Sequence, residues 1–194
     1  MSRNRASIGA RSLIRMDLTA HGAAFVSCTV GGVFLESVVL MGAASHHLAT
    51  IGIRLLTAEQ RNEQHQTPRD NIMFSIGQVA LWTCCMSLAI YVASRGAHGM
   101  FHAKHLNAIA VLGFAMPGVL GCLTSAALVR RSVNPGRYID KADALLSAVP
   151  SALVLCVAGG ALLVDGGKLD AIVGLAIILM LGVRTLVCLA RALD

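Results

Sequence analysis

Two ionisable side chains in the first apolar segment of the sequence have the spacing of a possible metal site. Asp17 and His21 are four residues apart, so a helix carries them on one face, about one turn apart. A carboxylate and an imidazole placed in this way can share a Zn²⁺-like ion. The alternative is an interfacial pair near the membrane edge, with Asp17 neutralised by Arg11 or Arg15.

Two further carboxylates stand at the start of later apolar segments. Glu36 begins one, and Asp143, with Ser147 four residues on, opens another. A charge inside a bilayer costs about 2.5–3.5 kcal/mol on insertion scales, so each is a functional candidate. We therefore predict that Asp17, His21, Glu36 and Asp143 bind a metal ion. The alternatives are a snorkelling or protonated carboxylate at the extracellular mouth for Glu36 and a helix-start carboxylate stabilised by the helix dipole for Asp143.

The other histidines are weaker candidates. His46 and His47 are adjacent, so they leave a helix in different directions, and we expect hydrogen-bonded structural roles for them. His98, His102 and His105 are spaced by four and then three, which would align them on one helical face as a metal-binding or pH-sensing patch. The alternative is a solvated outer loop, in which this spacing has no such meaning.

The sequence contains none of the motifs that mark common enzymes. It has no phosphate-binding glycine loop, nucleophile elbow or H-E-x-x-H pattern. Its six cysteines form no C-x-x-C pair, and they lie in apolar segments, where free cysteine behaves as a small hydrophobic residue. We therefore predict no enzymatic activity, no catalytic residues and no required cofactor.

The composition indicates that the lipid bilayer is the solvent of this chain. Hydrophobic residues make up 56% of the sequence and charged residues only 13%, whereas soluble domains average about 25% charged residues. The net charge is +6, and the basic residues lie between apolar segments, where they set the orientation of the chain in the membrane. We therefore expect no nucleic-acid partner.

Apolar segments of about 20 residues are long enough to cross a bilayer as helices. We predict an all-α integral membrane protein, a bundle of six transmembrane helices at residues 12–30, 33–53, 72–94, 106–129, 145–164 and 169–189. The first two helices are expected to turn at Gly31–Gly32. Residues 1–11 would form a cytoplasmic tail, and residues 12–194 a single transmembrane domain.

The distribution of positive charge gives this bundle an orientation. Lysine and arginine favour the cytoplasmic side of a membrane protein. Six spans with both termini in the cytoplasm place every lysine and arginine there except Arg95, Lys104 and Lys168. We therefore predict cytoplasmic termini, in what we expect to be a bacterial inner (plasma) membrane.

Three stretches of the sequence carry a resemblance to a known family. They are ATIGIRLLTAEQRNEQHQTPRDNIMF, FSIGQVALWTCCMSLAIYVASRG and VDGGKLDAIVGLAIILMLGVRTLV. Their order and texture resemble the six-span transmembrane domain of the cation diffusion facilitator (cation efflux) family. The resemblance implies transport of a divalent cation such as Zn²⁺ in exchange for protons, by a dimer.

The chain departs from that family at the positions that matter most. The resemblance places the metal ligands of the second span at Val38 and Gly42, neither of which can bind a metal. On the fifth span it gives Asp143 and Ser147 or, shifted by three residues, Leu146 and Pro150. Of these, only Asp143 is a plausible ligand. The family's cytoplasmic dimerisation domain has no counterpart in these 194 residues.

Two functions remain open at this point. The first is a cation-efflux-like divalent metal/proton antiporter with a degenerate site, in which Asp17, His21, Glu36 and Asp143 replace the usual ligands. It would work as a homodimer or within a larger membrane complex. The second is a non-transporting membrane subunit or scaffold of a larger complex, built on a transporter-like bundle.

Overall fold

The structure, a computed structural model, consists entirely of helices and their connections in the part of the chain that it describes. That part comprises residues 2–59, 68–102, 105–131, 141–163 and 166–193, with side chains at 15–55, 76–77, 79–102, 105–127, 148–163 and 166–184. The helices are α1 (Ser2–Phe34), α2 (Val38–Glu59), α3 (Pro68–Phe101), α4 (Ala108–Arg131), α5 (Lys141–Ala161) and α6 (Gly166–Leu193). The predicted all-α class is therefore confirmed.

In the part of the chain that the structure describes, four helices are long and apolar enough to cross a membrane. Their apolar stretches are Val38–Leu55, Val79–Phe101, Ala108–Ala127 and Gly166–Arg184. The described part of α5 contributes a shorter apolar stretch, Ala148–Ala161. Helix α1, with 33 residues, has the length but also carries Arg15, Asp17 and His21 in its middle, which lowers its mean hydropathy.

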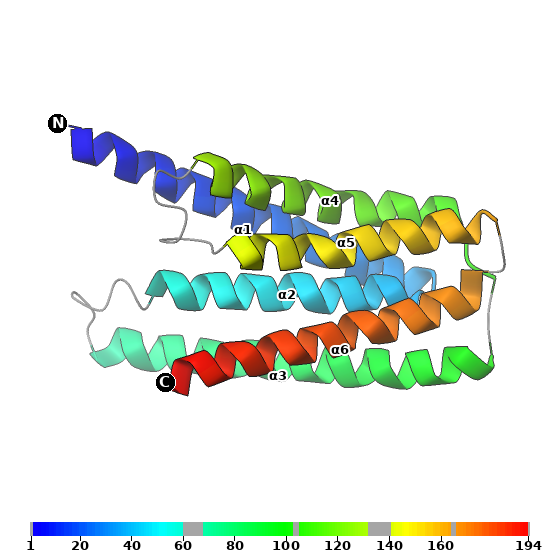
Figure 1. Cartoon of the computed structure of the whole chain (residues 1–194). Coiled ribbons are helices and arrows are strands. Elements are labelled where there is room, and N and C mark those ends of the chain that lie inside the picture. Colours follow the sequence, from blue (N-terminus) through cyan, green and yellow to red (C-terminus); the bar gives the residue numbers. More distant parts are fainter. Residues whose placement is uncertain (1, 60–67, 103–104, 132–140, 164–165, 194) are drawn as a thin grey trace.

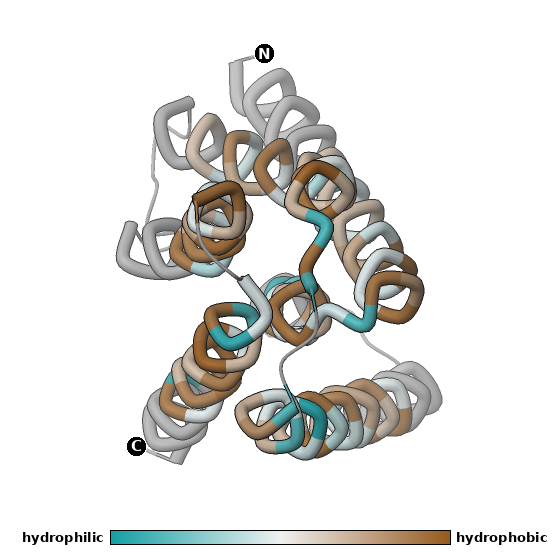
Figure 2. Tube along the Cα trace, turned by 90° about the vertical axis from the view of Figure 1, so that its right-hand side faces the viewer, coloured by the Kyte–Doolittle hydropathy of each residue, from teal (hydrophilic) through white to brown (hydrophobic). Residues whose placement is uncertain are grey.

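Helix α2 is the centre of the bundle. It contacts every other helix, and Figure 2, a view along the bundle, shows it surrounded by the other five. Its apolar stretch is 78% buried, against 17% for that of α3, which lies at the periphery. Residues of α2 are therefore the ones that meet side chains from several helices at once.

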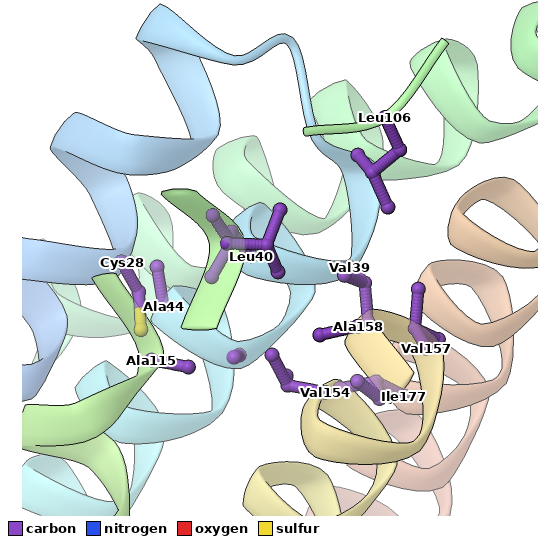
Figure 3. Packing of buried hydrophobic residues seen from close by; sticks show 12 residues of the cluster. Cys28, Val39, Leu40, Ala44, Leu106, Ala115, Val154, Val157, Ala158 and Ile177 are labelled. Carbon is purple, nitrogen blue, oxygen red and sulfur yellow. The ribbon is translucent and has the colours of Figure 1, made fainter. Parts of the chain in front are cut away.

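Buried apolar side chains of the neighbouring helices pack against α2. The largest buried apolar cluster joins Leu40 and Ala44 of α2 to Ala115 of α4, Val154 of α5 and Ile177 of α6 (Figure 3). In a bilayer, close approach matters because helix association depends on van der Waals packing and on internal hydrogen bonds.

The turn between α1 and α2 lies later in the sequence than predicted. Gly31 and Gly32 are helical, and the chain reverses at residues 35–37, where Glu36 has a φ of 50°. The expectation of a turn at Gly31–Gly32 is therefore wrong. The glycines serve packing instead: a Cβ at Gly31 would collide with the ring of Phe114, and one at Gly32 would lie 2.6 Å from Met41 Cγ.

Asp170, near the start of α6, holds the first turn of α2 in place. Its carboxylate accepts hydrogen bonds from Ser37 Oγ at 2.6 Å, from the Val38 amide at 2.6 Å and from the Val39 amide at 3.2 Å. The first amides of a helix have no partner within the helix, so a carboxylate from α6 satisfies them. This contact fixes α2 against α6 at the end of the bundle where α1 turns into α2 (Figure 1).

Candidate functional site

Ten polar or sulfur-bearing side chains gather inside the bundle around the second half of α2. Each is at most 9% exposed. They come from five helices: Asp17 and His21 of α1, His46, His47, Thr50 and Arg54 of α2, Cys122 and Ser125 of α4, Ser151 of α5, and Arg184 of α6. We call this group the buried cluster.

The carboxylate of Asp17 is the acidic centre of the buried cluster. It is 1% exposed, and its Oδ2 lies 3.3 Å from Nε of Arg54. Its Oδ1 accepts a hydrogen bond of 2.5 Å from the Ser125 hydroxyl and lies 3.7 Å from His21 Nε2. One carboxylate thus joins α1 to α2 by an ion pair and to α4 by a short hydrogen bond.

Two histidine rings continue the network away from Asp17. His21 Nε2 lies 3.0 Å from Ser125 Oγ, and His21 Nδ1 lies 3.0 Å from His47 Nδ1. The two ring centroids are 5.2 Å apart, and the rings are inclined at 42°. Asp17, Ser125, His21 and His47 therefore form one continuous hydrogen-bonded chain across α1, α4 and α2.

The remaining members tie α5 and α6 to the same place. Arg184 donates to Thr50 Oγ1 at 3.1 Å, and Thr50 donates to the His46 carbonyl at 2.9 Å. Cys122 Sγ and Ser151 Oγ are 3.2 Å apart, joining α4 to α5. The cluster therefore connects every helix of the bundle except α3.

The sequence positions explain why these groups meet. His46, Thr50 and Arg54 recur every four residues, so they form a stripe on one face of α2. Two glycines of α4 leave room for the imidazoles: a Cβ at Gly121 would lie 3.4 Å from His21 Nδ1, and one at Gly118 would lie 2.9 Å from His47 Nε2.

The four predicted metal ligands do not share one site. Asp17 and His21 meet in the buried cluster, as their spacing indicated. Glu36 lies 19 residues along the chain from Asp17, which corresponds to about 28 Å of helix. It is 3.3 Å from Arg95 in an exposed ion pair. Asp143 falls in α5, and its side chain is outside the described residues.

A complete set of metal ligands is not formed by the described residues. Within them, no three histidine, cysteine, aspartate or glutamate side chains converge closely enough to hold a metal ion. Asp17 and His21 supply two groups of the right type. The positively charged guanidinium of Arg54 lies 3.3 Å from the Asp17 carboxylate, on the side where a third ligand would be needed. A metal ion at Asp17 therefore requires Arg54 to move.

The sequence reasoning missed the two arginines and the serine of this site. Arg54 was expected in a cytoplasmic loop and Arg184 at the cytoplasmic end of the last span, but they are only 7% and 6% exposed. Ser125 carried no signal of its own. The spacing of Arg54, four residues after Thr50 and eight after His46, is the feature that could have placed it on the site-facing stripe.

The positions that the family resemblance assigns to metal ligands are closed by helix packing. Val38 is 6% exposed, and a Cβ added at Gly174 of α6 would lie 2.6 Å from Val38 Cγ1. A Cβ at Gly42 would lie 3.2 Å from the carbonyl oxygen of Gly174. The backbones of α2 and α6 approach each other closely here, and the residues at these positions pack the two helices together.

A second polar region lies at the end of the bundle where α1 turns into α2. A pocket of about 90 Å³ is lined there by Leu35, Glu36, Val38, Arg95, His98, Gly99, His102, His105, Leu106, Gly167, Asp170 and Ala171. Helix α3 runs on to Phe101, so His98 is helical, and its ring stacks on that of His102 with centroids 4.5 Å apart. All three histidines are exposed.

Comparison with known proteins identifies no relative of this chain. No protein-family model, no curated protein and no solved structure matches the chain. The functional argument therefore depends on the geometry of the buried cluster.

Proposed function

We propose that this chain is a cation-efflux-like integral membrane protein that exchanges a small cation for protons at the buried cluster. The observation that carries the proposal is the Asp17 carboxylate, buried between Arg54 and Ser125 inside a bundle of apolar helices. Ionisable groups within membrane-spanning bundles are expensive and mark ion or proton paths by default.

Arg54 acts as the counter-ion that a cation must replace. Its guanidinium occupies one side of the Asp17 carboxylate at 3.3 Å, so a cation reaches both carboxylate oxygens only when Arg54 leaves. Arg54 is five residues from the end of α2 at Glu59, or about 7.5 Å of helix. A guanidinium on its long stem can extend that far towards the interface. The Asp17 carboxylate thus binds either Arg54 or a cation. A two-state transporter requires two alternative states of this kind.

The residue types suggest which cations to test first. Zn²⁺ is one, because a carboxylate and an imidazole at Asp17 and His21 are ligands that it accepts. A monovalent cation is another, because with neutral histidines the charges of Asp17, Arg54 and Arg184 leave a single net positive charge. A divalent ion adds two more charges to a site of low dielectric constant, which weakens its binding.

The proposal includes six spans with both termini in the cytoplasm of a bacterial inner membrane. It is supported by the charge distribution along the sequence and by the arrangement of the helices. The first residues of α1 and the last of α6 lie at the same end of the bundle (Figure 1). The resemblance to cation efflux proteins is the support for a homodimer.

Transport assays on purified protein in liposomes test this function. Vesicles that contain a pH-sensitive dye are exposed to a gradient of Zn²⁺, Mn²⁺, Na⁺ or K⁺, and the internal pH is followed. We expect one of these gradients to move protons in the wild type and in Glu36→Gln, and not in Asp17→Asn. Proton movement that is the same in Asp17→Asn as in the wild type, or absent for all four cations, would contradict the proposal.

One observation favours the second candidate, a non-transporting subunit of a larger membrane complex. Val38 and Gly42, at the positions that the family uses for ligands, pack α2 closely against Gly174 of α6. A bundle whose ligand positions are occupied by packing residues is suited to support a partner protein. Purification in a mild detergent decides: a stable larger complex, together with no cation-driven proton flux, would favour this function.

A further inference from the structure

Histidines gather in the pocket of about 90 Å³ at the end of the bundle where α1 turns into α2, which we call the end pocket. This end lies opposite the two termini (Figure 1). Its lining includes His98 of α3, His102 directly after α3, and His105. Imidazole is a ligand that suits Zn²⁺, Ni²⁺ and Cu²⁺, so the end pocket has the residue type that such ions prefer.

The backbone places His98 and His102 on neighbouring turns of one helix. The amide of His102 donates to the carbonyl of His98 at 3.0 Å, so the helical hydrogen-bond pattern of α3 continues one residue beyond Phe101. Side chains four residues apart then lie on the same face. Two histidines at this spacing on a helix are the arrangement that holds Zn²⁺ in the H-E-x-x-H metalloproteases.

The two imidazole rings are already close enough to share an ion. Their centroids are 4.5 Å apart, and the rings are inclined at only 14°. In a tetrahedral Zn²⁺ site with bonds of about 2.0–2.1 Å, two nitrogen ligands lie about 3.3 Å apart. The terminal torsion of a histidine is soft, and both side chains are exposed. The rings can therefore turn a nitrogen each towards one ion while the backbone stays in place.

The two carboxylates of the end pocket are engaged with protein partners. Glu36 Oε2 lies 3.3 Å from Arg95 Nη2. Asp170 accepts hydrogen bonds from Ser37 Oγ and from two backbone amides of α2. We therefore expect the carboxylates to act through their charge. Two carboxylates against one guanidinium in the lining favour a cation over an anion.

His105 is positioned separately from the pair on α3. The next residue, Leu106, is 6% exposed and belongs to the largest buried apolar cluster. Asn107 caps α4 by accepting a hydrogen bond of 3.1 Å from the Ala110 amide. Among the described residues, no three metal-binding side chains converge on one point. The ligands are therefore expected to be two, His98 and His102.

We propose that His98 and His102 form a metal site of their own at the end pocket, which binds Zn²⁺, Ni²⁺ or Cu²⁺. Each histidine supplies one imidazole nitrogen, and water fills the remaining coordination positions. Mg²⁺ and Ca²⁺ prefer oxygen ligands, so the pair discriminates against them. This inference goes beyond the proposed function, because the cation exchange at the buried cluster does not pass through the end pocket.

Zn²⁺ binding to the full chain tests the site. The protein, without a polyhistidine tag, is placed in lipid nanodiscs, and Zn²⁺ binding is measured by isothermal titration calorimetry. Loss of a mere second-shell partner weakens metal binding by about 10–100-fold, so we expect His98→Ala and His102→Ala each to weaken it by at least about tenfold. The matched control is His105→Ala, an exposed histidine of the same pocket, which should keep the wild-type affinity.

A spectroscopic count of ligands needs no variant. Pulsed electron paramagnetic resonance of bound Cu²⁺ detects the imidazole nitrogens that coordinate it. We expect two imidazoles on one Cu²⁺ ion in the wild type, and one in His98→Ala or His102→Ala. One imidazole or none in the wild type overturns the proposal.

Asp17→Asn distinguishes this site from the buried cluster. We expect it to leave the histidine-dependent Zn²⁺ binding and the count of two imidazoles unchanged, since it alters a carboxylate in the other half of the bundle. Zn²⁺ binding that is lost in Asp17→Asn but kept in the double variant His98→Ala, His102→Ala would overturn the inference and support the buried cluster as the metal site. No Zn²⁺ binding to the wild type, or an equal loss in His105→Ala, would also overturn it.

Discussion

The two halves of α2 show different ways of placing charge inside an apolar bundle. At its start, Asp170 is surrounded by three donors from Ser37, Val38 and Val39. At its far half, Asp17 faces the side chain of Arg54 and a hydrogen-bonded chain that ends at an open nitrogen of His47. The first arrangement is held mainly by backbone amides, whose positions are fixed by the helix itself. The second consists of side chains that can exchange partners, which is what a functional site needs.

The largest effect on this comparison is expected from Asp17→Asn. Removing one partner of a buried ion pair leaves the other charge uncompensated, so we predict a loss of about 3–5 kcal/mol in the free energy of unfolding. The double variant Asp17→Asn with Arg54→Gln removes both charges and should recover most of that loss. Unfolding titrations in detergent measure both. Equal stability of the single variant and the wild type would show that the pair is not the centre of the cluster.

Asp170→Ala should have the next largest effect. It leaves two backbone amides of α2 and the Ser37 hydroxyl without their acceptor, and we predict a loss of about 2–4 kcal/mol. Asn107→Ala is the control, since Asn107 caps α4 through one exposed bond of 3.1 Å to the Ala110 amide. The same unfolding assay should show a smaller loss for it, of about 1 kcal/mol. If Asp170→Ala costs no more than this control, the cap is not what fixes the start of α2.

Gly174→Ala probes the packing of α6 against the first half of α2. Its methyl group would lie 2.6 Å from Val38 Cγ1 and 2.8 Å from the Val38 carbonyl carbon, so the helices must separate. We predict a loss of about 1–3 kcal/mol from overpacking. Gly182→Ala, on the same helix with nothing within 4 Å, should be neutral or slightly stabilising. Thermal unfolding of the two variants side by side gives the difference, and identical curves would argue against a close crossing.

Glu36→Gln should have the smallest effect. The side chains of Glu36 and Arg95 are 44% and 40% exposed, and exposed ion pairs contribute at most about 1 kcal/mol. We predict little change in stability and full cation-driven proton flux. Loss of flux in Glu36→Gln would transfer the functional argument from the buried cluster to the end pocket.

The sequence alone predicted the helices and one local contact. The helical segments were visible because a bilayer span requires a long apolar run. Asp17 and His21 were correctly paired because a spacing of four is a local property of one helix. The prediction of a turn at Gly31–Gly32 was wrong because glycine is common both in turns and where helices pack closely. Here the contact with Phe114, from another helix, shows that the glycines serve packing.

The rest of the site depends on contacts between distant parts of the chain. Ser125 is 108 residues from Asp17, and Arg184 is 134 residues from Thr50. Arg54 sits near the end of an apolar run, where charge counting assigns an arginine to the cytoplasm, and only the approach of α1 shows that it faces a carboxylate. The cap by Asp170 could not be predicted from the sequence either, because a carboxylate near the start of α6 accepts hydrogen bonds from the first turn of α2.

The most direct test of the central claim, that the charges of the buried cluster are functional, uses the Asp17→Asn, Arg54→Gln double variant. Its unfolding free energy and its cation-driven proton flux are measured on the same preparation, beside the wild type. The account predicts a folded protein of nearly wild-type stability that moves no protons in response to any cation. A double variant that is stable and keeps wild-type flux would contradict it.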